Sequence, residues 1–131
     1  MTKRVLVVDD EVATVKMVQL ALEGEGLDVT TATNGAECLL QVNASRPDLV
    51  ILDVAMPVLD GFEALRALRQ QEGTRDLPVI MLTARTADED VLRGWSTGVD
   101  LYLTKPFSIE ELLTATRRIL ATTGDSAADS E

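Results

Sequence analysis

Residues 49–53 read Leu49-Val-Ile-Leu-Asp53, four apolar side chains in a row followed by a carboxylate. Two further continuous apolar runs, Val5-Leu-Val-Val8 and Val79-Ile-Met-Leu82, have the same character. Such runs are typical of strands that are buried on both faces, as in a parallel sheet. The weaker runs Val29-Thr-Thr-Ala32 and Leu101-Tyr-Leu103 bring the predicted strands to five, and the half-polar second run is predicted at an edge of the sheet.

Amphipathic segments separate these runs, and their apolar residues recur at helical spacing. In the segment after the first run, the predicted apolar face consists of Val12, Val15, Val18 and Leu22. Four of the five predicted helices begin with a capping residue that is followed three positions later by Glu. These pairs are Asn34 with Glu37, Asp60 with Glu63, Thr86 with Glu89, and Ser108 with Glu111. The alternation predicts an α/β fold, a (βα)5 doubly wound parallel sheet of five strands.

Length and composition limit the classes of function. A chain of 131 residues fits one domain, and the small, polar, acidic residues at the end predict a domain over 1–121 and an acidic disordered tail over 122–131. With 12 Lys and Arg against 22 Asp and Glu, direct binding to nucleic acid or to an anionic membrane is not expected. The chain has no His and one Cys, which excludes catalysis by its own histidine and an internal disulfide. No run is long enough for a membrane span or a signal segment, so the cytoplasm is the expected location.

Polar residues follow the apolar runs, where ligands bind in an open parallel sheet. The set comprises Asp9 and Asp10 after the first run, Asp53 after the third, Thr83 and Ala84 after the fourth, and Thr104, Lys105 and Pro106 after the fifth. Carboxylates hold Mg²⁺, aspartate can accept a phosphoryl group, and lysine supplies a positive charge for phosphoryl oxygens. Asp53 directly follows a buried run, where an unpaired carboxylate is costly, so a functional role is favoured over a structural one. The pattern therefore predicts phosphoryl chemistry at this edge of the sheet.

Four motifs in this order resemble the receiver domains of two-component response regulators, and the resemblance runs from about Arg4 to Leu120. The motifs are Val7-Val-Asp-Asp-Glu11, Asp53-Val-Ala-Met-Pro-Val-Leu-Asp-Gly61, Leu82-Thr-Ala84 and Tyr102-Leu-Thr-Lys-Pro-Phe107. Each motif is weak alone, but four at the expected strand ends are specific. The resemblance implies a flavodoxin-like strand order of 2-1-3-4-5.

The resemblance also implies a role for each matching residue. Asp53 is the expected phosphoryl acceptor, and Mg²⁺ or Mn²⁺ is expected on Asp9, Asp10, Asp53 and the backbone carbonyl of Ala55. The expected phosphoryl-binding and switch residues are Thr83, Ala84, Lys105 and Tyr102. A cis peptide bond is expected before Pro106.

The implied function is that of a phosphoacceptor signalling domain rather than an enzyme. It would take a phosphoryl group from a histidine kinase or a His-phosphotransfer protein. The surface of the fourth helix, fifth strand and fifth helix would then act on a downstream protein partner, with the chain a monomer or a phosphorylation-promoted dimer. The matching residues leave open whether the chain is a stand-alone receiver or a receiver fragment of a larger DNA-binding transcriptional regulator.

Two other classes of protein use the same kind of sheet. A phosphatase of the haloacid-dehalogenase type needs Asp-x-Asp after the first strand, where this chain has Asp9-Asp10. A flavodoxin-like mononucleotide binder needs a hydroxyl- and glycine-rich loop there, and the acidic residues 9–11 would repel a phosphate. A receiver domain is the reading that accounts for the residues at all these strand ends.

Overall fold

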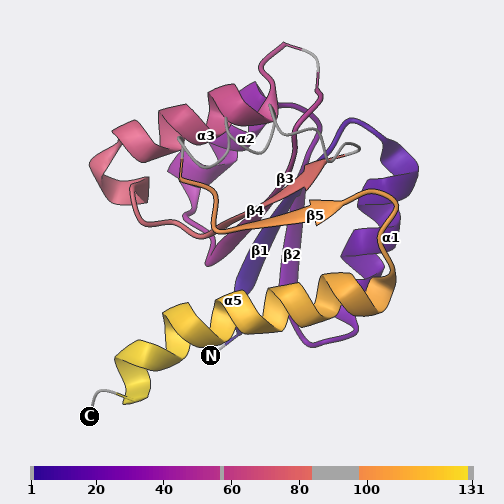
Figure 1. Ribbon diagram of the computed structural model, residues 1–131. Coiled ribbons are helices and arrows are strands. Elements are labelled where there is room, and N and C mark those ends of the chain that lie inside the picture. Colours follow the sequence, from indigo (N-terminus) through magenta and orange to yellow (C-terminus); the bar gives the residue numbers. More distant parts are fainter. Residues whose placement is uncertain (1, 57, 84–97, 130–131) are drawn as a thin grey trace.

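The computed structural model describes residues 2–56, 58–83 and 98–129 of the chain, with side chains as far as residue 122. Helices and strands alternate along these residues (Figure 1). The strands are β1 (Arg4–Val8), β2 (Asp28–Ala32), β3 (Leu49–Asp53), β4 (Val79–Thr83) and β5 (Leu101–Thr104). The helices are α1 (Val12–Glu23), α2 (Gly35–Ala44), α3 (Gly61–Gln70), the short 3-10 helix η1 (Glu72–Thr74) and α5 (Ile109–Asp129).

The five strands form one parallel sheet in the order β2-β1-β3-β4-β5, as the family resemblance implies. The half-polar strand β2 lies at one edge and β5 at the other. In the middle of the sheet, Val7 of β1 pairs with Ile51 of β3, which in turn pairs with Ile80 of β4. Because all strands run the same way, their carboxyl ends meet at one edge, where the chain then turns into the helices.

Two hydrophobic cores lie on the two faces of the sheet, and this explains why the central strands are apolar throughout. Alternate residues of β1, such as Leu6 and Val7, belong to different cores. Side chains of α2 and α3 complete one core, and side chains of α1 and α5 complete the other. In Figure 1, α2 and α3 lie together on one side of the strands, away from α1 and α5. A strand between two helical layers must present apolar side chains to both.

Three of the predicted helix caps are present in the structure. Asn34 accepts a hydrogen bond from the backbone of Glu37, Asp60 and Glu63 form a reciprocal capping box, and Ser108 and Glu111 bond in the same reciprocal way. The Thr86–Glu89 pair lies outside the described residues. Each such cap satisfies backbone N–H groups that have no partner inside their own helix, and is worth about 1 kcal/mol.

One expectation about a helix differs from the structure. Val12 is predicted on the buried face of α1, but its side chain is 78% exposed because the first turn of α1 extends beyond the layer covered by α5 and the sheet. The helix α5 is described as far as Asp129, and the acidic disordered tail over 122–131 stays a prediction. Residues with high helix propensity, including Ala127 and Ala128, extend a helix that is already nucleated. The division of the chain after residue 121 stays a prediction.

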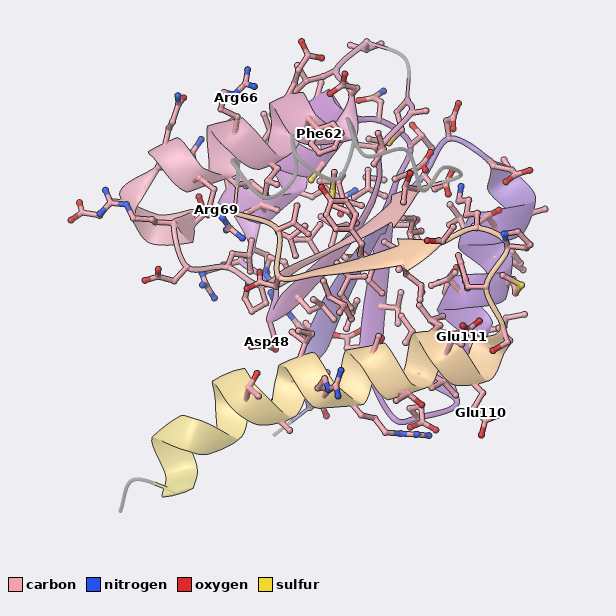
Figure 2. The ribbon with its side chains drawn as sticks, viewed as in Figure 1. Asp48, Phe62, Arg66, Arg69, Glu110 and Glu111 are labelled. Carbon is pink, nitrogen blue, oxygen red and sulfur yellow. The ribbon has the colours of Figure 1, made fainter. Side chains whose placement is uncertain are left out.

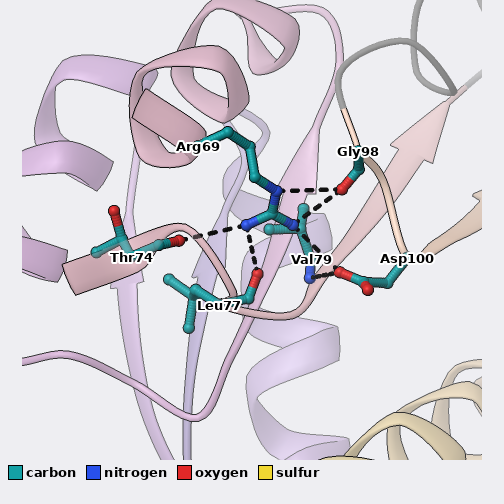
Figure 3. Close-up of polar contacts among 6 residues, drawn as sticks. All are labelled: Arg69, Thr74, Leu77, Val79, Gly98 and Asp100. Carbon is teal, nitrogen blue, oxygen red and sulfur yellow. Dashed lines mark hydrogen bonds and ion pairs between the residues drawn. The ribbon is translucent and has the colours of Figure 1, made fainter. Parts of the chain in front are cut away.

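Arg69 of α3 bonds to the segments that lead into β4 and β5 (Figure 3). Its guanidinium donates hydrogen bonds to the backbone carbonyls of Thr74, Leu77 and Gly98. It also lies 3.2 Å from Asp100, whose carboxylate accepts a hydrogen bond from the backbone N–H of Val79 at 2.8 Å. Arg66, one turn earlier in the same helix, is exposed and points away from the sheet (Figure 2). Arg69 therefore joins three segments at the end of the sheet opposite to the carboxyl edge.

Candidate functional site

Three carboxylates gather at the carboxyl edge of the sheet. Asp9 directly follows β1, and Asp53 is the last residue of β3; their exposed fractions are only 1% and 5%. Asp10 is exposed beside them. One carboxylate oxygen from each of these residues lies within 4.8 Å of the others. The neighbouring central positions of β1 and β3 in the sheet bring the residues together, as the sequence predicts from the strand ends.

Lys105 closes the site from the loop after β5. Its Nζ lies 2.9 Å from Oδ2 of Asp9 and 3.3 Å from Oδ1 of Asp53. Its backbone N–H donates to the carbonyl of Thr83 at 2.6 Å, and the Lys105–Pro106 peptide bond is cis, which is the geometry that the resemblance implies. The ammonium thus provides the countercharge that two buried carboxylates need.

The backbone around Asp9 fixes the other side of the site. Oδ1 of Asp9 accepts a hydrogen bond from the backbone N–H of Glu11 at 2.9 Å, so both carboxylate oxygens of Asp9 have partners. The backbone N–H of Asp9 donates to the carbonyl of Ala32 at 3.2 Å. Asp9 is therefore held between β2, α1 and Lys105, whereas Asp53 has one oxygen in the ion pair.

Burial and neighbouring charges shift the pKa values of Asp53 and Lys105. Burial raises the pKa of Asp53 to about 6, the charges of Asp9 and Asp10 act in the same direction, and Lys105 opposes them. Burial alone would lower the pKa of Lys105, but its hydrogen bond to Asp9 and the charges of Asp53 and Asp9 outweigh that effect and raise the pKa. At neutral pH the site therefore holds an ionised Asp53 and a charged Lys105.

The loop from β3 to α3 is packed closely around Asp53. The backbone N–H of Gly61 donates to the carbonyl of Val54 at 2.9 Å. A Cβ atom at Gly61 would lie only 2.3 Å from the backbone oxygen of Asp53, so only glycine allows this approach. Gly35 of α2 similarly meets Leu59, whose carbonyl accepts the Gly35 N–H at 3.1 Å. These contacts keep the start and the end of the loop beside Asp53.

The candidate switch residues lie on adjacent strands. The register pairs Thr83 with Thr104 and Met81 with Tyr102, and side chains alternate along a strand, so Thr83 and Tyr102 lie on the same face of the sheet. Thr83 is buried and Tyr102 is half-buried against the core that α2 and α3 complete. Ala84 lies outside the described residues. Of the other predicted site residues, Ala55 is exposed in the loop after Asp53.

The residues at the site fit a hard divalent cation. Mg²⁺ and Mn²⁺ prefer oxygen ligands, and the site offers three carboxylates and no histidine or cysteine. Two of these carboxylates are buried, where an unneutralised negative charge is costly. The Asp9, Asp10 and Asp53 group could therefore hold Mg²⁺.

Sequence reasoning missed the residues that act through the backbone. The close approaches of Gly35 and Gly61 depend on how loops pack, and a glycine after a helix cap is too common to signal them. Asp60 was identified with Glu63 as a helix start, yet nothing in that pattern shows that Gly61 approaches Asp53. The hydrogen bond from the N–H of Glu11 could have been found, because an Asp side chain often accepts a bond from the backbone N–H two residues later.

Among the described residues, no helix is both long enough and apolar enough to cross a membrane.

Comparison with known proteins decides the family. A model described as the response regulator receiver domain matches residues 5–117. The chain belongs to this receiver domain family. The chemotaxis response regulator CheY4 of Vibrio cholerae superposes on this receiver domain with a TM-score of 0.87 at 38% identity, over 91% of this chain and 99% of that one.

This receiver domain is also similar to the receiver domain of a sensor histidine kinase and to about half of a transcriptional regulatory protein. The receiver domain of the sensor histidine kinase PA1611 from Pseudomonas aeruginosa, solved with a magnesium ion coordinated in its active-site cleft, has a TM-score of 0.85 at 30% identity over 92% of this chain and 99% of that one. The alkaline phosphatase synthesis transcriptional regulatory protein PhoP of Bacillus subtilis is 43% identical over 131 residues, which are 100% of this chain and 54% of PhoP. The chain spans about half the length of the curated relatives it matches.

Proposed function

We propose that this receiver domain accepts a phosphoryl group on Asp53 from a histidine kinase or a His-phosphotransfer protein. The observation that carries the proposal is the ion pair of Lys105 with Asp53, within 4.8 Å of two further carboxylates. Asp53 has a carboxylate oxygen outside that ion pair, and Lys105 supplies a positive charge beside it. Receiver domains are signalling domains rather than classical enzymes, and they take phosphoryl groups from histidine kinases.

The reaction transfers the group from a histidine nitrogen of the donor to a carboxylate oxygen of Asp53. A P–O bond forms, the P–N bond breaks, and the imidazole nitrogen keeps the electron pair of that bond. Lys105 is placed to pair with the phosphoryl oxygens, since its Nζ already contacts Asp53. Asp9 holds Lys105 in position through the 2.9 Å contact.

We assign the metal site to Asp9, Asp10, Asp53 and the backbone carbonyl of Ala55. A bound Mg²⁺ would neutralise the charge that collects on the phosphoryl oxygens during transfer. The carboxylate group in this structure supports the assignment, and so does the magnesium ion coordinated in the similar receiver domain of PA1611. The Gly61 contact with Asp53 keeps the loop that carries Ala55 close to the carboxylates.

We propose that phosphorylation is read out through Thr83 and Tyr102. The added negative charge favours a state in which the Thr83 hydroxyl donates to the phosphoryl group. Tyr102 lies on the same face of the neighbouring strand and would change position with it. The surface that responds is expected to include the fourth helix, which lies outside the described residues, together with β5 and α5. Its downstream protein partner is not identified by these residues.

One observation favours a second setting for the same function, in which the receiver is part of a longer protein. The chain covers about half of regulators such as PhoP, so it could serve as the receiver portion of a longer transcriptional regulator. In that case the receiver would control a separate DNA-binding part. The domain over residues 1–121 and the expected location in the cytoplasm stay predictions under either arrangement.

Labelling with acetyl phosphate tests the proposal. The wild-type chain should gain one phosphoryl group in the presence of Mg²⁺, and it should gain none when EDTA removes the metal before acetyl phosphate is added. Asp53→Asn keeps the size of the side chain but has no carboxylate nucleophile, so it should not be labelled. Equal labelling of Asp53→Asn and the wild type would reject Asp53 as the acceptor. A flavin spectrum on addition of flavin mononucleotide would favour the mononucleotide-binder alternative.

A further inference from the structure

Val58 has an unfavourable backbone conformation in the loop that follows Asp53. Its φ angle is 72°, and among the described residues it is the non-glycine residue with a positive φ. Positive φ is accessible to glycine and tolerated by asparagine, but a β-branched side chain there is a genuine outlier. Such a residue destabilises the fold relative to glycine.

Within the residues that the structure describes, the Val58 side chain gains no burial that would compensate for its backbone conformation. The Val58 side chain is 81% exposed, so it contributes little to either hydrophobic core. The loop is instead held by backbone contacts on both sides of Val58. The Gly61 N–H bonds the carbonyl of Val54 and the Gly35 N–H bonds the carbonyl of Leu59. A glycine at position 58 would satisfy the same loop with less strain.

The loop lies where a protein donor must approach. Asp53 is only 5% exposed, so a protein donor must lie against the loops around Asp53 to present its phosphohistidine. Val58 lies in the middle of the loop whose two ends meet beside Asp53. In Figure 1 this loop, between β3 and α3, projects from the sheet. An exposed valine in this loop is placed to contact whatever protein delivers the phosphoryl group.

We infer that Val58 is a specificity-determining contact for the protein that phosphorylates Asp53, packing against an apolar patch beside the donor's phosphohistidine. This inference rests on the proposed function and extends it. The side chain then stabilises the complex with the donor at the cost of strain in the free receiver. A small phosphoryl donor has no such patch, so the contact acts only on transfer from a protein.

The experiment compares two phosphoryl donors on the same variants. The protein donor is an autophosphorylated histidine-kinase core, selected beforehand as the purified core that labels the wild-type chain fastest, and the small donor is acetyl phosphate. Val58→Gly and Val58→Asn remove the side chain and relieve the strain, whereas Val58→Ala shortens the side chain and keeps a strained residue. Leu40→Ala is the matched control, because Leu40 is 71% exposed on α2 and is equally apolar.

We expect each Val58 variant to lower kcat/KM for transfer from the kinase core by roughly tenfold. This loss corresponds to the burial of one valine side chain that the complex with the donor no longer gains. Labelling by acetyl phosphate and transfer to Leu40→Ala should stay at the wild-type level. Val58→Gly and Val58→Asn should also unfold at a higher temperature than the wild type, and Val58→Ala should not.

Three results would overturn the inference. Unchanged transfer from the kinase core to Val58→Gly would show that the side chain is not a donor contact. An equal loss of acetyl phosphate labelling would place the effect in the loop geometry at Asp53. An unchanged melting temperature of Val58→Gly would contradict the strain. Each of these leaves the proposed function standing, whereas a wild-type chain that acetyl phosphate does not label would contradict both.

Discussion

The Nζ of Lys105 lies 3.3 Å from Oδ1 of Asp53, and the same ammonium lies 2.9 Å from Asp9. One lysine from the loop after β5 therefore neutralises part of the charge of two buried carboxylates, one directly after β1 and one at the end of β3. This arrangement stabilises the site before any phosphoryl group arrives. It also leaves a cation beside the oxygen atoms that the phosphoryl group would join.

The Lys105→Met variant tests the role of Lys105 in phosphoryl transfer separately from Mg²⁺ binding. Lys105→Met removes the charge that would pair with the phosphoryl oxygens, so labelling by acetyl phosphate should slow at least about tenfold, the equivalent of about 1.4 kcal/mol. Mg²⁺ binding should persist, because the three carboxylates remain and two of them, Asp9 and Asp53, are no longer paired with Lys105. Calorimetric Mg²⁺ titration and the labelling rate measure the two effects. Lys16→Met, an exposed substitution on α1, is the control, and labelling of Lys105→Met at the control rate would contradict the role of Lys105.

A methyl group at Gly61 should disrupt both the fold and the site. The added Cβ would lie 2.3 Å from the backbone oxygen of Asp53, so the loop or the end of β3 must shift. We expect Gly61→Ala to lower the free energy of unfolding by about 1 to 3 kcal/mol and to reduce labelling of Asp53. Gly73→Ala provides the matched control, because a Cβ there meets nothing within 4 Å. If urea unfolding gives the two variants equal stability, the close approach at Gly61 is not as described.

Arg69 should contribute strongly to stability, in contrast to its neighbour Arg66. Arg69→Ala leaves the carbonyls of Leu77 and Gly98 without a donor and Asp100 without its ion-pair partner. We expect a loss of about 2 to 4 kcal/mol in the free energy of unfolding, measured by urea titration. Arg66→Ala should change it by less than about 0.5 kcal/mol, because Arg66 is exposed. A single ammonium cannot bond all these groups, so Arg69→Lys should recover only part of the loss, and full recovery would argue against the network.

Cys38 should be inert while the protein is folded. Burial raises the pKa of the Cys38 thiol to about 12, and the thiolate is the reactive form. A thiol reagent at pH 8 should therefore modify Cys38 only as fast as the protein unfolds, and urea should release full reactivity. Between about pH 9 and 12 the unfolded thiol is ionised while the folded thiol keeps its proton. The free energy of unfolding then falls as pH rises, and Cys38→Ala should show less of that decline. Rapid modification of the native protein at pH 8 would contradict the burial of Cys38.

The sequence predicted the sheet well because the signals for it are local. Continuous apolar runs marked the strands, and the carboxylates after the runs at residues 5–8 and 49–52 marked the edge where Asp9 and Asp53 meet. The order of the strands came from the family resemblance rather than from the periodicity. Val12 was misplaced because helical spacing does not show where a covering helix ends.

The remaining features depend on contacts between distant segments. The bonds from Arg69 to Gly98 and Asp100, and the approach of Gly61 to Asp53, exist only once the loops have packed. The strain at Val58 is invisible in sequence, because valine ordinarily indicates a strand and not a residue with positive φ. Local pattern therefore located the site, and packing determined how that site is held.

Direct mapping of the phosphoryl group tests the central claim that Asp53 is the acceptor. Borohydride reduces an acyl phosphate to an alcohol, so a phosphorylated aspartate becomes homoserine. The wild-type chain is labelled with acetyl phosphate and Mg²⁺, reduced, digested and sequenced by mass spectrometry. We predict homoserine at position 53 and at no other aspartate, and none after incubation without acetyl phosphate. Homoserine at Asp9 or Asp10 with an unmodified Asp53 would contradict the account.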